Sequence, residues 1–283
     1  MRVPTARQLF LSDNAIDAAG RDERERAFFH AIRTRNGTNK TTHDRRLDAV
    51  NAVVETVLPD DRPLAIMDVA VSSGIATMEW MESLDRAGVH YRMTAGDFCV
   101  HASLVSFARW LHVLIDGTGY PLQFDIAGRA VPYPIGRRRA LLMPPLLLFA
   151  HLVRRMGPRI LPASGAARTG RDVLLVSPRL AARADLTIVE DDILVPGRFE
   201  RAFHVVRAAN ILSRIYFAEP TLLAMGRNLV ARLKPGGILV VCRTDEHGFN
   251  HGTIFRLGED RVEVLRRIGG GSECEGMLAT LTP

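Results

Sequence analysis

The chain of 283 residues carries a net charge of +6 and is 47% hydrophobic and 24% charged, a composition that is typical of a folded globular protein and excludes a disordered one. Its three cysteines lie far apart in the sequence, with no pair at metal-ligand spacing, so the sequence indicates neither a disulfide framework nor a zinc cluster. The N-terminus lacks the apolar region of a signal peptide, and the most apolar segment, 140–152, contains two prolines and is too short to span a bilayer, so we expect a cytoplasmic protein.

Two helices are predicted before the first strand. The segment 22–34 places Phe28 and Phe29 on one face of a helix, and an Asn-Gly pair ends it. Thr41 and Asp44 have the spacing of a capping box, which predicts that a second amphipathic helix opens there.

Strands and helices alternate through most of the remaining chain. This repetition is typical of a mostly parallel sheet with helices on both faces, and it predicts an α/β fold. The predicted elements are strands at 64–70, 90–96, 186–190, 202–208 and 238–243, and helices at 75–87 and 219–233. A hairpin with strands at 253–257 and 261–268 is expected around a Gly-Glu-Asp turn near the end.

A long gap separates the second predicted strand from the third and is too long for one crossover helix. Within it, the runs 112–115 and 121–126 flank Asp-Gly-Thr-Gly, which is a hairpin signal. An apolar helical stretch then reaches Met156. We therefore predict an inserted α+β subdomain over 104–172.

The positive charge of the chain lies in the same region. Residues 99–185 contain twelve arginines against four aspartates. This pattern is typical of a solvated basic surface, and it also suits the phosphates of a nucleic acid. Within it, 137–160 places arginines on both sides of an apolar stretch, which is consistent with peripheral contact with an anionic membrane. The alternatives are that this stretch is the core of the insertion or a homodimer contact.

The segment 66–74, Ile-Met-Asp-Val-Ala-Val-Ser-Ser-Gly, carries the clearest functional signal. An apolar run ends at Asp68, a turn of small residues follows, and a helical pattern opens directly after Gly74. A strand, a tight loop of small side chains and a helix bring backbone N–H groups against a nucleotide-like ligand. We therefore predict that this loop binds such a ligand.

Five segments, in this order, resemble the class I S-adenosylmethionine-dependent methyltransferases. They are 68–74 after the first strand, Asp97 at the end of the second, 189–194 after the third, 206–212 at the fourth and 233–239 before the fifth. The resemblance implies a doubly wound, mostly parallel seven-stranded sheet, S-adenosylmethionine as the cofactor, and methyl transfer as the reaction.

The resemblance also implies which residues contact the cofactor. Asp97 corresponds to the acidic residue that the family places on the ribose hydroxyls, and an acid at the end of the third strand lies near the adenine. The implied cofactor-binding residues are Asp68, Ala70, Ser72, Ser73, Gly74, Asp97, Phe98, Asp191, Asp192, Arg207 and Asn210. We expect no metal ion in the site.

The same resemblance implies a division of the chain. Family members often lay N-terminal helices over the cofactor, so we expect a helical lid at 1–60. The methyltransferase core is expected at 61–103 and 173–283, with the basic insertion at 104–172 between its two parts.

The loop departs from the family pattern where glycine is usual. Ala70 and Ser72 occupy these positions, and each would be strained if the backbone φ angle there were positive. Ser72-Ser73-Gly74 and the segment 210–217 also resemble the chemotaxis-receptor carboxyl methyltransferases. The acidic residues that follow the loop in that group are absent, so its substrate is not carried over.

Three residues are candidates for the chemistry. Asn210 and Tyr216 follow the fourth strand, where the family places the methyl group. Asn210 is suited to accept a hydrogen bond from the substrate, to hold an amino group of the cofactor, or to cap the backbone. Tyr216 is suited to close the site or to pack in the core. His43 is a candidate general base because its ordinary pKa lies near neutrality, and the alternative is an exposed or capping histidine.

Three functions are compatible with these patterns. The first is methyl transfer to an O or N atom of a small-molecule metabolite, with the insertion supplying walls for a substrate chamber. The second is an RNA or protein methyltransferase that uses the basic insertion. The third is a non-catalytic module that binds S-adenosylmethionine. The size of the insertion favours the first.

Overall fold

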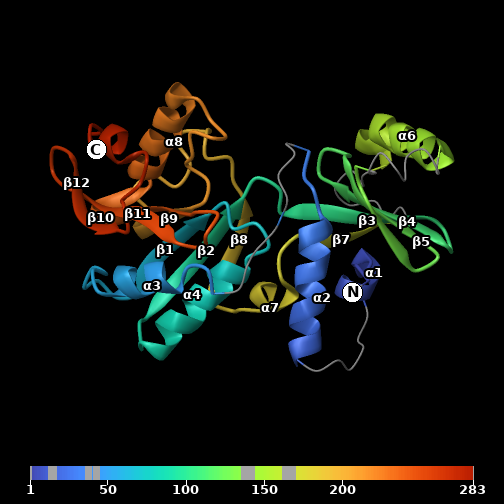
Figure 1. Ribbon diagram of the computed structural model, residues 1–283, viewed down its shortest axis with the longest axis horizontal. Coiled ribbons are helices and arrows are strands. Elements are labelled where there is room, and N and C mark those ends of the chain that lie inside the picture. The colour runs from blue at the N-terminus through green and yellow to red at the C-terminus, as the bar shows by residue number, and fades with distance from the viewer. Residues whose placement is uncertain are drawn as a thin grey trace. The chain divides into compact units, whose positions relative to one another are not determined.

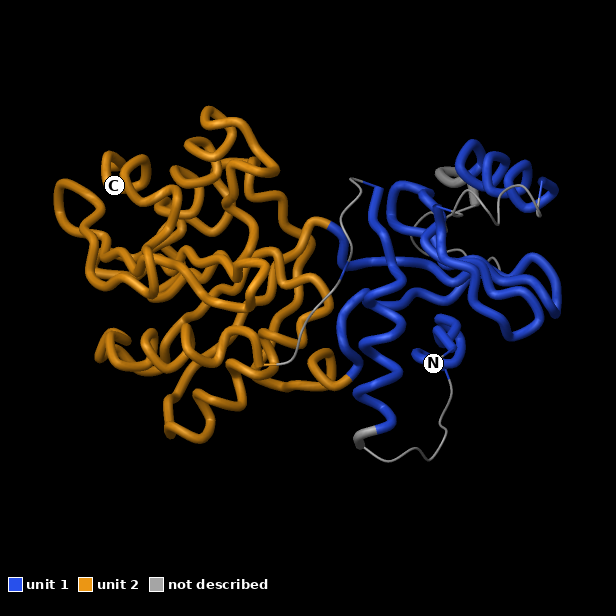
Figure 2. Tube along the Cα trace, viewed as in Figure 1, with its two compact units in different colours: residues 1–42, 99–178 blue, residues 43–98, 179–283 orange. Residues whose placement is uncertain are grey.

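The computed structural model describes residues 2–11, 18–35, 40, 45–134, 144–160 and 170–282, without the side chains of 18–19 and 157–160. The chain forms two compact units (Figure 2). Unit 1 comprises Met1–Thr42 and Cys99–Pro178, and unit 2 comprises His43–Phe98 and Arg179–Pro283. Each unit is built around its own sheet, and each is described by itself.

Unit 2 contains a seven-stranded sheet in the order β12-β11-β10-β9-β1-β2-β8. Its strands are β1 (Leu64–Val69), β2 (Tyr91–Asp97), β8 (Leu186–Glu190), β9 (Phe203–Ala209), β10 (Leu233–Thr244), β11 (Asn250–Leu257) and β12 (Val262–Ile268). The pairs along β8-β2-β1-β9-β10 are parallel, and β11 and β12 continue the sheet as antiparallel strands. This is the mostly parallel seven-stranded sheet that the sequence predicted, including its final hairpin.

Helices cover both faces of this sheet, as expected of a doubly wound fold (Figure 1). Helix α8 (Glu219–Ala231) lies on one face, and α3 (Asp48–Glu55) and α4 (Ile75–Arg86) lie on the other. Successive strand residues point to opposite faces, so Met67 and Val69 of β1 pack in the same buried cluster as Leu222 of α8. A short helix, α9 (Glu275–Leu278), packs against α8.

The Lys-Pro-Gly-Gly turn before the fifth parallel strand has a steric reason. Strand β10 begins at Leu233, five residues earlier than predicted, and its pairing with β9 is irregular between Leu233 and Ile238. A Cβ atom on Gly237 would lie 2.9 Å from the carbonyl oxygen of Lys234 and 3.1 Å from that of His204. Only glycine fits this close approach of two backbones.

Unit 1 contains a five-stranded antiparallel sheet in the order β6-β5-β4-β3-β7. Its strands are β3 (His101–Ala108), β4 (Leu111–Asp116), β5 (Pro121–Ile126), β6 (Arg129–Pro132) and β7 (Gly170–Leu174). The hairpin of β4 and β5 and the α+β character of the insertion are as the sequence predicted. Strands β3, β6 and β7 were not predicted.

The two faces of this second sheet are covered by different helices. On one face, Phe28, Phe29 and Ile32 from α2 (Ala18–Ala31) and the residue after it form a cluster with Leu114 of β4. On the other, Ala150 of α6 (Pro144–Ile160) belongs to a separate cluster with β-strand residues. The apolar stretch before Met156 is therefore partly the core of unit 1.

The structure groups the N-terminal helices differently from the expected lid at 1–60. Helix α1 (Ala6–Phe10) and α2 belong to unit 1, together with the insertion, whereas α3 belongs to unit 2. The apolar face of α2 is buried on the antiparallel sheet. A lid function for this segment stays a prediction.

One further prediction concerned membranes. No helix in the described part of the chain is both long enough and apolar enough to cross a bilayer.

Candidate functional site

The predicted site residues of unit 2 gather at one edge of the sheet. Strands β8, β2, β1, β9 and β10 are parallel, so the loops that follow them meet at their shared carboxyl edge. In parallel α/β sheets, ligands bind in the crevice outside this edge. The candidate site is therefore built from the segments just after these strands.

The loop between β1 and α4 has an unusual backbone. The φ angles of Ala70, Ser72 and Gly74 are +56°, +60° and +76°. This left-handed conformation costs a non-glycine residue about 1–2 kcal/mol. The loop therefore has the backbone conformation that glycine favours, although two of the three residues are alanine and serine. The strain that the sequence analysis expected at Ala70 and Ser72 for a positive φ angle is present.

The N–H groups of this loop mostly face acceptors within unit 2. The N–H of Val71 donates to the carbonyl of Gly96 at 3.2 Å, and that of Gly74 donates to the carbonyl of Val71 at 2.8 Å. The N–H of Ser72 donates to Oδ2 of Asp97 at 2.7 Å. This corrects the expectation that the loop presents these N–H groups to a ligand.

Asp97 and Phe98 lie where the resemblance implies cofactor contact. Asp97 is the last residue of β2 and is half-buried, and its hydrogen bond to Ser72 fixes the loop against the end of that strand. The next side chain, Phe98, is 65% exposed. A carboxylate and an exposed aromatic ring are thus adjacent at the carboxyl edge.

Asp68 and Arg207 have a different role from the predicted one. They lie opposite each other on β1 and β9, and two hydrogen bonds of 2.9 and 2.6 Å join the guanidinium to the carboxylate. Thr77 also donates to Asp68 at 2.7 Å, and the guanidinium lies 4.1 Å from the centre of the Trp80 ring. Both charged side chains are buried. They form an ion pair inside the fold and do not reach the surface of the site.

Asp191 likewise belongs to a buried ion pair. Its carboxylate accepts hydrogen bonds of 2.6 and 3.1 Å from the guanidinium of Arg232, and both side chains are 1% exposed. The neighbouring Asp192 is half-buried, and one of its oxygens accepts the N–H of Leu194 at 2.9 Å, which caps the turn after β8. Of the two acids, only Asp192 is placed to meet a ligand.

Asn210 lies at the end of β9 with a φ angle of +59°, which asparagine tolerates better than most residues. Its Oδ1 accepts the N–H of Thr244 at 2.8 Å, so that oxygen is already engaged. Its Nδ2 is buried and has no hydrogen-bond partner in the described part of the structure. The backbone-capping interpretation is thus correct for the oxygen, and the amide nitrogen remains as a donor for a ligand.

Tyr216 is on the surface, not in the core. Its side chain is 65% exposed, whereas Phe217 packs against the main buried cluster of unit 2. The last catalytic candidate, His43, lies outside the described residues. Ser73 is fully buried at the base of the loop.

Exposed apolar side chains gather at the same edge. Six of them lie in segments that follow β2, β8, β9 and β10. They are Phe98, Leu194, Val195, Ile215, Tyr216 and Phe249. Apolar residues exposed together around a carboxyl edge favour a ligand with an apolar part.

A cavity of about 340 Å³ opens beside this rim, between the ends of β10 and β12 and the start of β11. It is lined by Arg243, His251 and Glu273, among others. The His251 ring accepts the N–H of Gly270 through Nδ1 at 2.9 Å, and its Nε2 lies 3.3 Å from Oδ2 of Asp245. With both ring nitrogens engaged, His251 is held in place as a wall of the cavity.

The residues that line this cavity, Glu273 among them, were not among the predicted site residues. Arg243 lies 3.3 Å from Glu273, an ion pair that depends on how β12 returns to the same edge. Cys242, which also lines the cavity, is a buried thiol whose pKa is raised by burial to about 11. The described residues contain no group of three metal-binding side chains.

Comparisons with solved structures found similar chains at low sequence identity. Family models and curated proteins give no match. Among solved structures, the citrinin polyketide synthase CMeT domain matches 71% of this chain and 35% of its own, at 15% identity and a TM-score of 0.37. Phosphoethanolamine N-methyltransferase 1 from Haemonchus contortus, solved with phosphoethanolamine and S-adenosylhomocysteine, matches 74% and 28%, at 10% identity and a TM-score of 0.35.

A third similar structure is described as a cyclase. The [4+2]-cyclase SpnF matches 78% of this chain and 54% of its own, at 13% identity and a TM-score of 0.34. The chain thus spans between 28% and 54% of the length of these three proteins. A fold does not by itself fix a reaction, so the function argued next rests on the residues of this chain.

Proposed function

We propose that the chain binds S-adenosylmethionine at the carboxyl edge of unit 2 and transfers its methyl group to an O or N atom of a small molecule. The observation that carries this proposal is the left-handed loop after β1, joined by the Ser72 N–H to the carboxylate of Asp97. This loop and this acid end two neighbouring parallel strands.

The hydrogen bonds of the loop favour a nucleoside without phosphates. Dinucleotide-binding loops offer free N–H groups to a pyrophosphate. Here the N–H groups of Val71, Ser72 and Gly74 have protein acceptors, and Asp97 adds negative charge next to the loop. Phosphate would find few donors there, whereas S-adenosylmethionine has no phosphate and carries a cationic sulfonium.

The residues at the edge fit the parts of that cofactor. Asp97 would accept hydrogen bonds from the vicinal ribose hydroxyls, as acids at this position do in dinucleotide-binding sheets. Phe98 supplies an exposed ring for the flat purine, and Asp192 has a second carboxylate oxygen for an amino group. The buried, unpartnered Nδ2 of Asn210 would donate to an oxygen of the bound molecule. The cofactor itself supplies an electrophilic methyl group.

The protein has two tasks in such a reaction, which are to align the acceptor atom and to exclude water. The exposed apolar side chains at the edge suit both, because they would be covered by a substrate with an apolar part. A small apolar or aromatic acceptor fits this rim better than a nucleic acid does, since only one arginine lines the neighbouring cavity.

Calorimetric titration with S-adenosylmethionine and S-adenosylhomocysteine tests the proposal. We expect micromolar binding, and Asp97→Asn should weaken it at least tenfold, because a hydrogen bond to a charged group contributes about 1.5–3 kcal/mol. Asp60→Asn, which changes an exposed acid in the turn before β1, is the matched control. Because Asp97 also holds the loop, thermal unfolding of each variant separates a lost ligand contact from a loosened loop.

The outcomes separate the remaining functions. Wild-type protein that binds neither compound would contradict the proposal. Binding without transfer of labelled methyl groups to any small-molecule fraction of a cell extract would favour a non-catalytic binding module. Transfer to RNA or protein in the same extract would favour the macromolecular alternative.

A further inference from the structure

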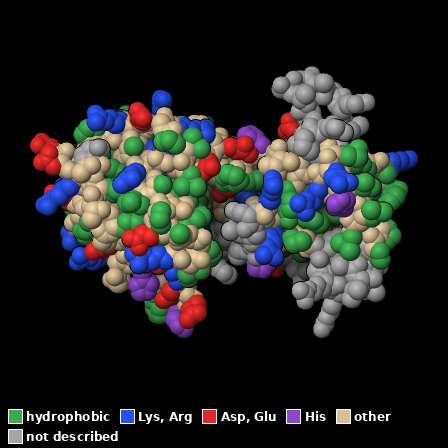
Figure 3. All heavy atoms as spheres, turned by 90° about the horizontal axis from the view of Figure 1, so that it is seen from above, with side chains coloured by type: hydrophobic (Ala, Val, Ile, Leu, Met, Phe, Trp, Pro, Cys, Tyr) green, Lys and Arg blue, Asp and Glu red, His purple; other side chains and the backbone are tan. Residues whose placement is uncertain are grey.

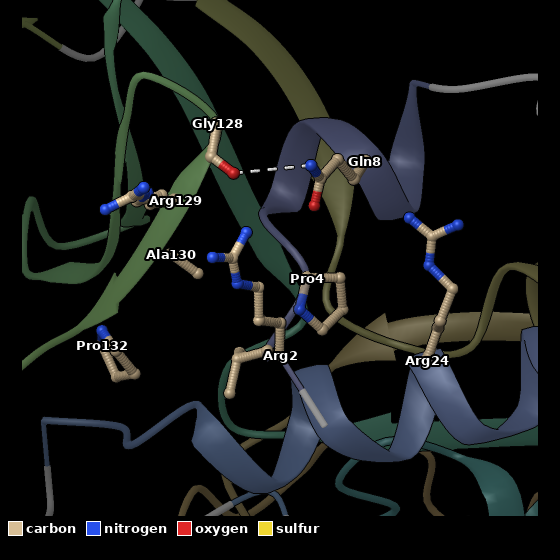
Figure 4. A pocket seen from close by; sticks show the side chains of 9 residues that line it. Arg2, Pro4, Gln8, Arg24, Gly128, Arg129, Ala130 and Pro132 are labelled. Carbon is tan, nitrogen blue, oxygen red and sulfur yellow. Dashed lines mark hydrogen bonds between the residues drawn. The ribbon is translucent and has the colours of Figure 1, made fainter.

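Unit 1 contains a cavity of about 570 Å³ that is lined by residues of this unit alone (Figure 4). It is lined by the N-terminal segment, by α2, and by the turn between β5 and β6 with the start of β6. Its volume lies in the range of small-molecule sites. Three of its lining side chains are arginines, namely Arg2, Arg24 and Arg129.

The wall formed by the N-terminal segment is anchored by a buried side chain. Gln123 of β5 is 1% exposed, accepts the N–H of Ala6 at 2.8 Å, and donates to the carbonyl of Pro4 at 3.1 Å. Gln8 accepts the N–H of Thr5 at 3.0 Å and donates to the carbonyl of Gly128 at 3.5 Å. These contacts hold Arg2 next to the β5–β6 turn, so the cavity belongs to the folded unit.

In the part of the chain that the structure describes, the three guanidinium groups have no carboxylate partner. No ion pair or hydrogen bond joins Arg2, Arg24 or Arg129 to an acid within the described residues, and the half-buried Arg24 extends from α2 across from Arg129 (Figure 4). Asp125, on the strand before the turn, is engaged by the N–H of Gly128 at 2.8 Å and lies 3.9 Å from Arg7. Within the described residues, the cavity therefore concentrates positive charge that no carboxylate neutralises.

Guanidinium groups around one cavity have a specific chemical preference. The planar fork of arginine matches the oxygens of a phosphate in a bidentate manner. Several such groups also create a local potential that concentrates anions. Figure 3 shows Arg and Lys side chains on the one face of unit 1 that it presents.

We infer that this cavity binds the phosphate group of a small phosphorylated molecule. The inference does not depend on the proposed methyl transfer, because the cavity uses residues of unit 1 alone and requires no cofactor. Since Arg2 and Arg24 approach from the N-terminal segment and from α2, the ligand also joins these two elements to the sheet.

Calorimetric titration of the full chain with inorganic pyrophosphate, at 0.1 M salt, tests the inference. We expect saturable binding at one site, weakened at least fivefold by Arg24→Gln and by Arg129→Gln. Arg109→Gln is the matched control, because Arg109 is an exposed arginine on the β3–β4 turn of the same unit and does not line the cavity. It should change the affinity by less than twofold. Thermal unfolding without ligand should show that all three variants are folded.

A second readout follows from the position of Arg2. Pyrophosphate should protect the peptide bond after Arg2 from trypsin in the wild type, and this protection should be lost in Arg24→Gln. Absence of saturable binding, or equal weakening by Arg109→Gln, would overturn the inference. Tighter binding of citrate than of pyrophosphate would overturn the preference for phosphate. A short single-stranded RNA is the last comparison. If it bound more tightly than pyrophosphate, and if Arg109→Gln weakened its binding as much as Arg24→Gln and Arg129→Gln did, the binding site would be the basic surface and not the cavity.

Discussion

The strained loop after β1 leads to a prediction about stability. Ala70 and Ser72 have φ angles of +56° and +60°, where a side chain costs about 1–2 kcal/mol and glycine costs almost nothing. Glycine also makes the unfolded chain more flexible, which opposes folding by about 0.4–1 kcal/mol. The difference is a net gain of about 0.5–1 kcal/mol for each of Ala70→Gly and Ser72→Gly. For a domain of this size, 1 kcal/mol shifts the Tm by about 2–4 °C.

Fluorescence of Trp80 provides the assay. The chain has two tryptophans, and Trp80 is fully buried in unit 2. In a Trp110→Phe background, urea denaturation followed by fluorescence therefore reports on unit 2 alone. The midpoint should rise in Ala70→Gly and in Ser72→Gly at an unchanged slope.

Ala87→Gly is the matched control for this experiment. Ala87 is an exposed alanine at the end of α4 with a φ angle of −79°, where glycine offers no relief. This variant should lose stability by about 0.5–1 kcal/mol. If Ala70→Gly and Ser72→Gly lost as much as Ala87→Gly, the argument from backbone strain would be refuted.

Two further predictions concern charged groups inside unit 2. Removing one partner of the buried Asp68–Arg207 pair, as in Arg207→Met, should lower the free energy of unfolding by about 3–5 kcal/mol, measured by urea denaturation. The double variant Asp68→Leu, Arg207→Met should lose less stability than the sum of the losses in the two single variants. Strictly additive losses would contradict the pairing. The pKa of His204 is lowered by burial and by the ammonium of Lys234, 3.1 Å from its Nε2, so the unfolded chain takes up a proton that the folded one resists. The free energy of unfolding of unit 2 should therefore fall as the pH drops below about 6.5, the ordinary pKa of histidine. His204→Gln should reduce this loss of stability at low pH. If the pH profile of stability were unchanged in that variant, another group would be responsible.

Much of unit 2 could be predicted because its signals are local. Asp68 near the end of β1 and Asp97 at the end of β2 indicated the carboxyl edge before any pairing was known. The strand bounds follow the sequence within a few residues, apart from the early start of β10. There the bulge depends on contact with the β9 backbone, which is distant in sequence.

The errors in the candidate site have a different cause. Asp68, Arg207 and Asp191 were assigned to a ligand because they lie in the segments that resemble the family, but their partners are fixed by strand order and helix placement. One signal was present in the sequence. A charged residue inside an apolar strand must find an opposite charge when that strand is buried, and both β1 and β9 contain one. Strands β3 and β7 were missed because their pairing joins the two ends of the insertion.

The ion pair of Asp68 and Arg207 also sets a constraint on synthesis. Its two residues are 139 positions apart, and the insertion that forms most of unit 1 is made between them. At about 5–20 residues per second, the ribosome needs roughly 7–28 s to reach Arg207 after adding Asp68. Throughout that interval, the first two strands of the seven-stranded sheet have neither β9 beside them nor a cation for their buried carboxylate. All strands of the antiparallel sheet are therefore synthesised before β9, so that sheet can pair while the parallel sheet is still incomplete.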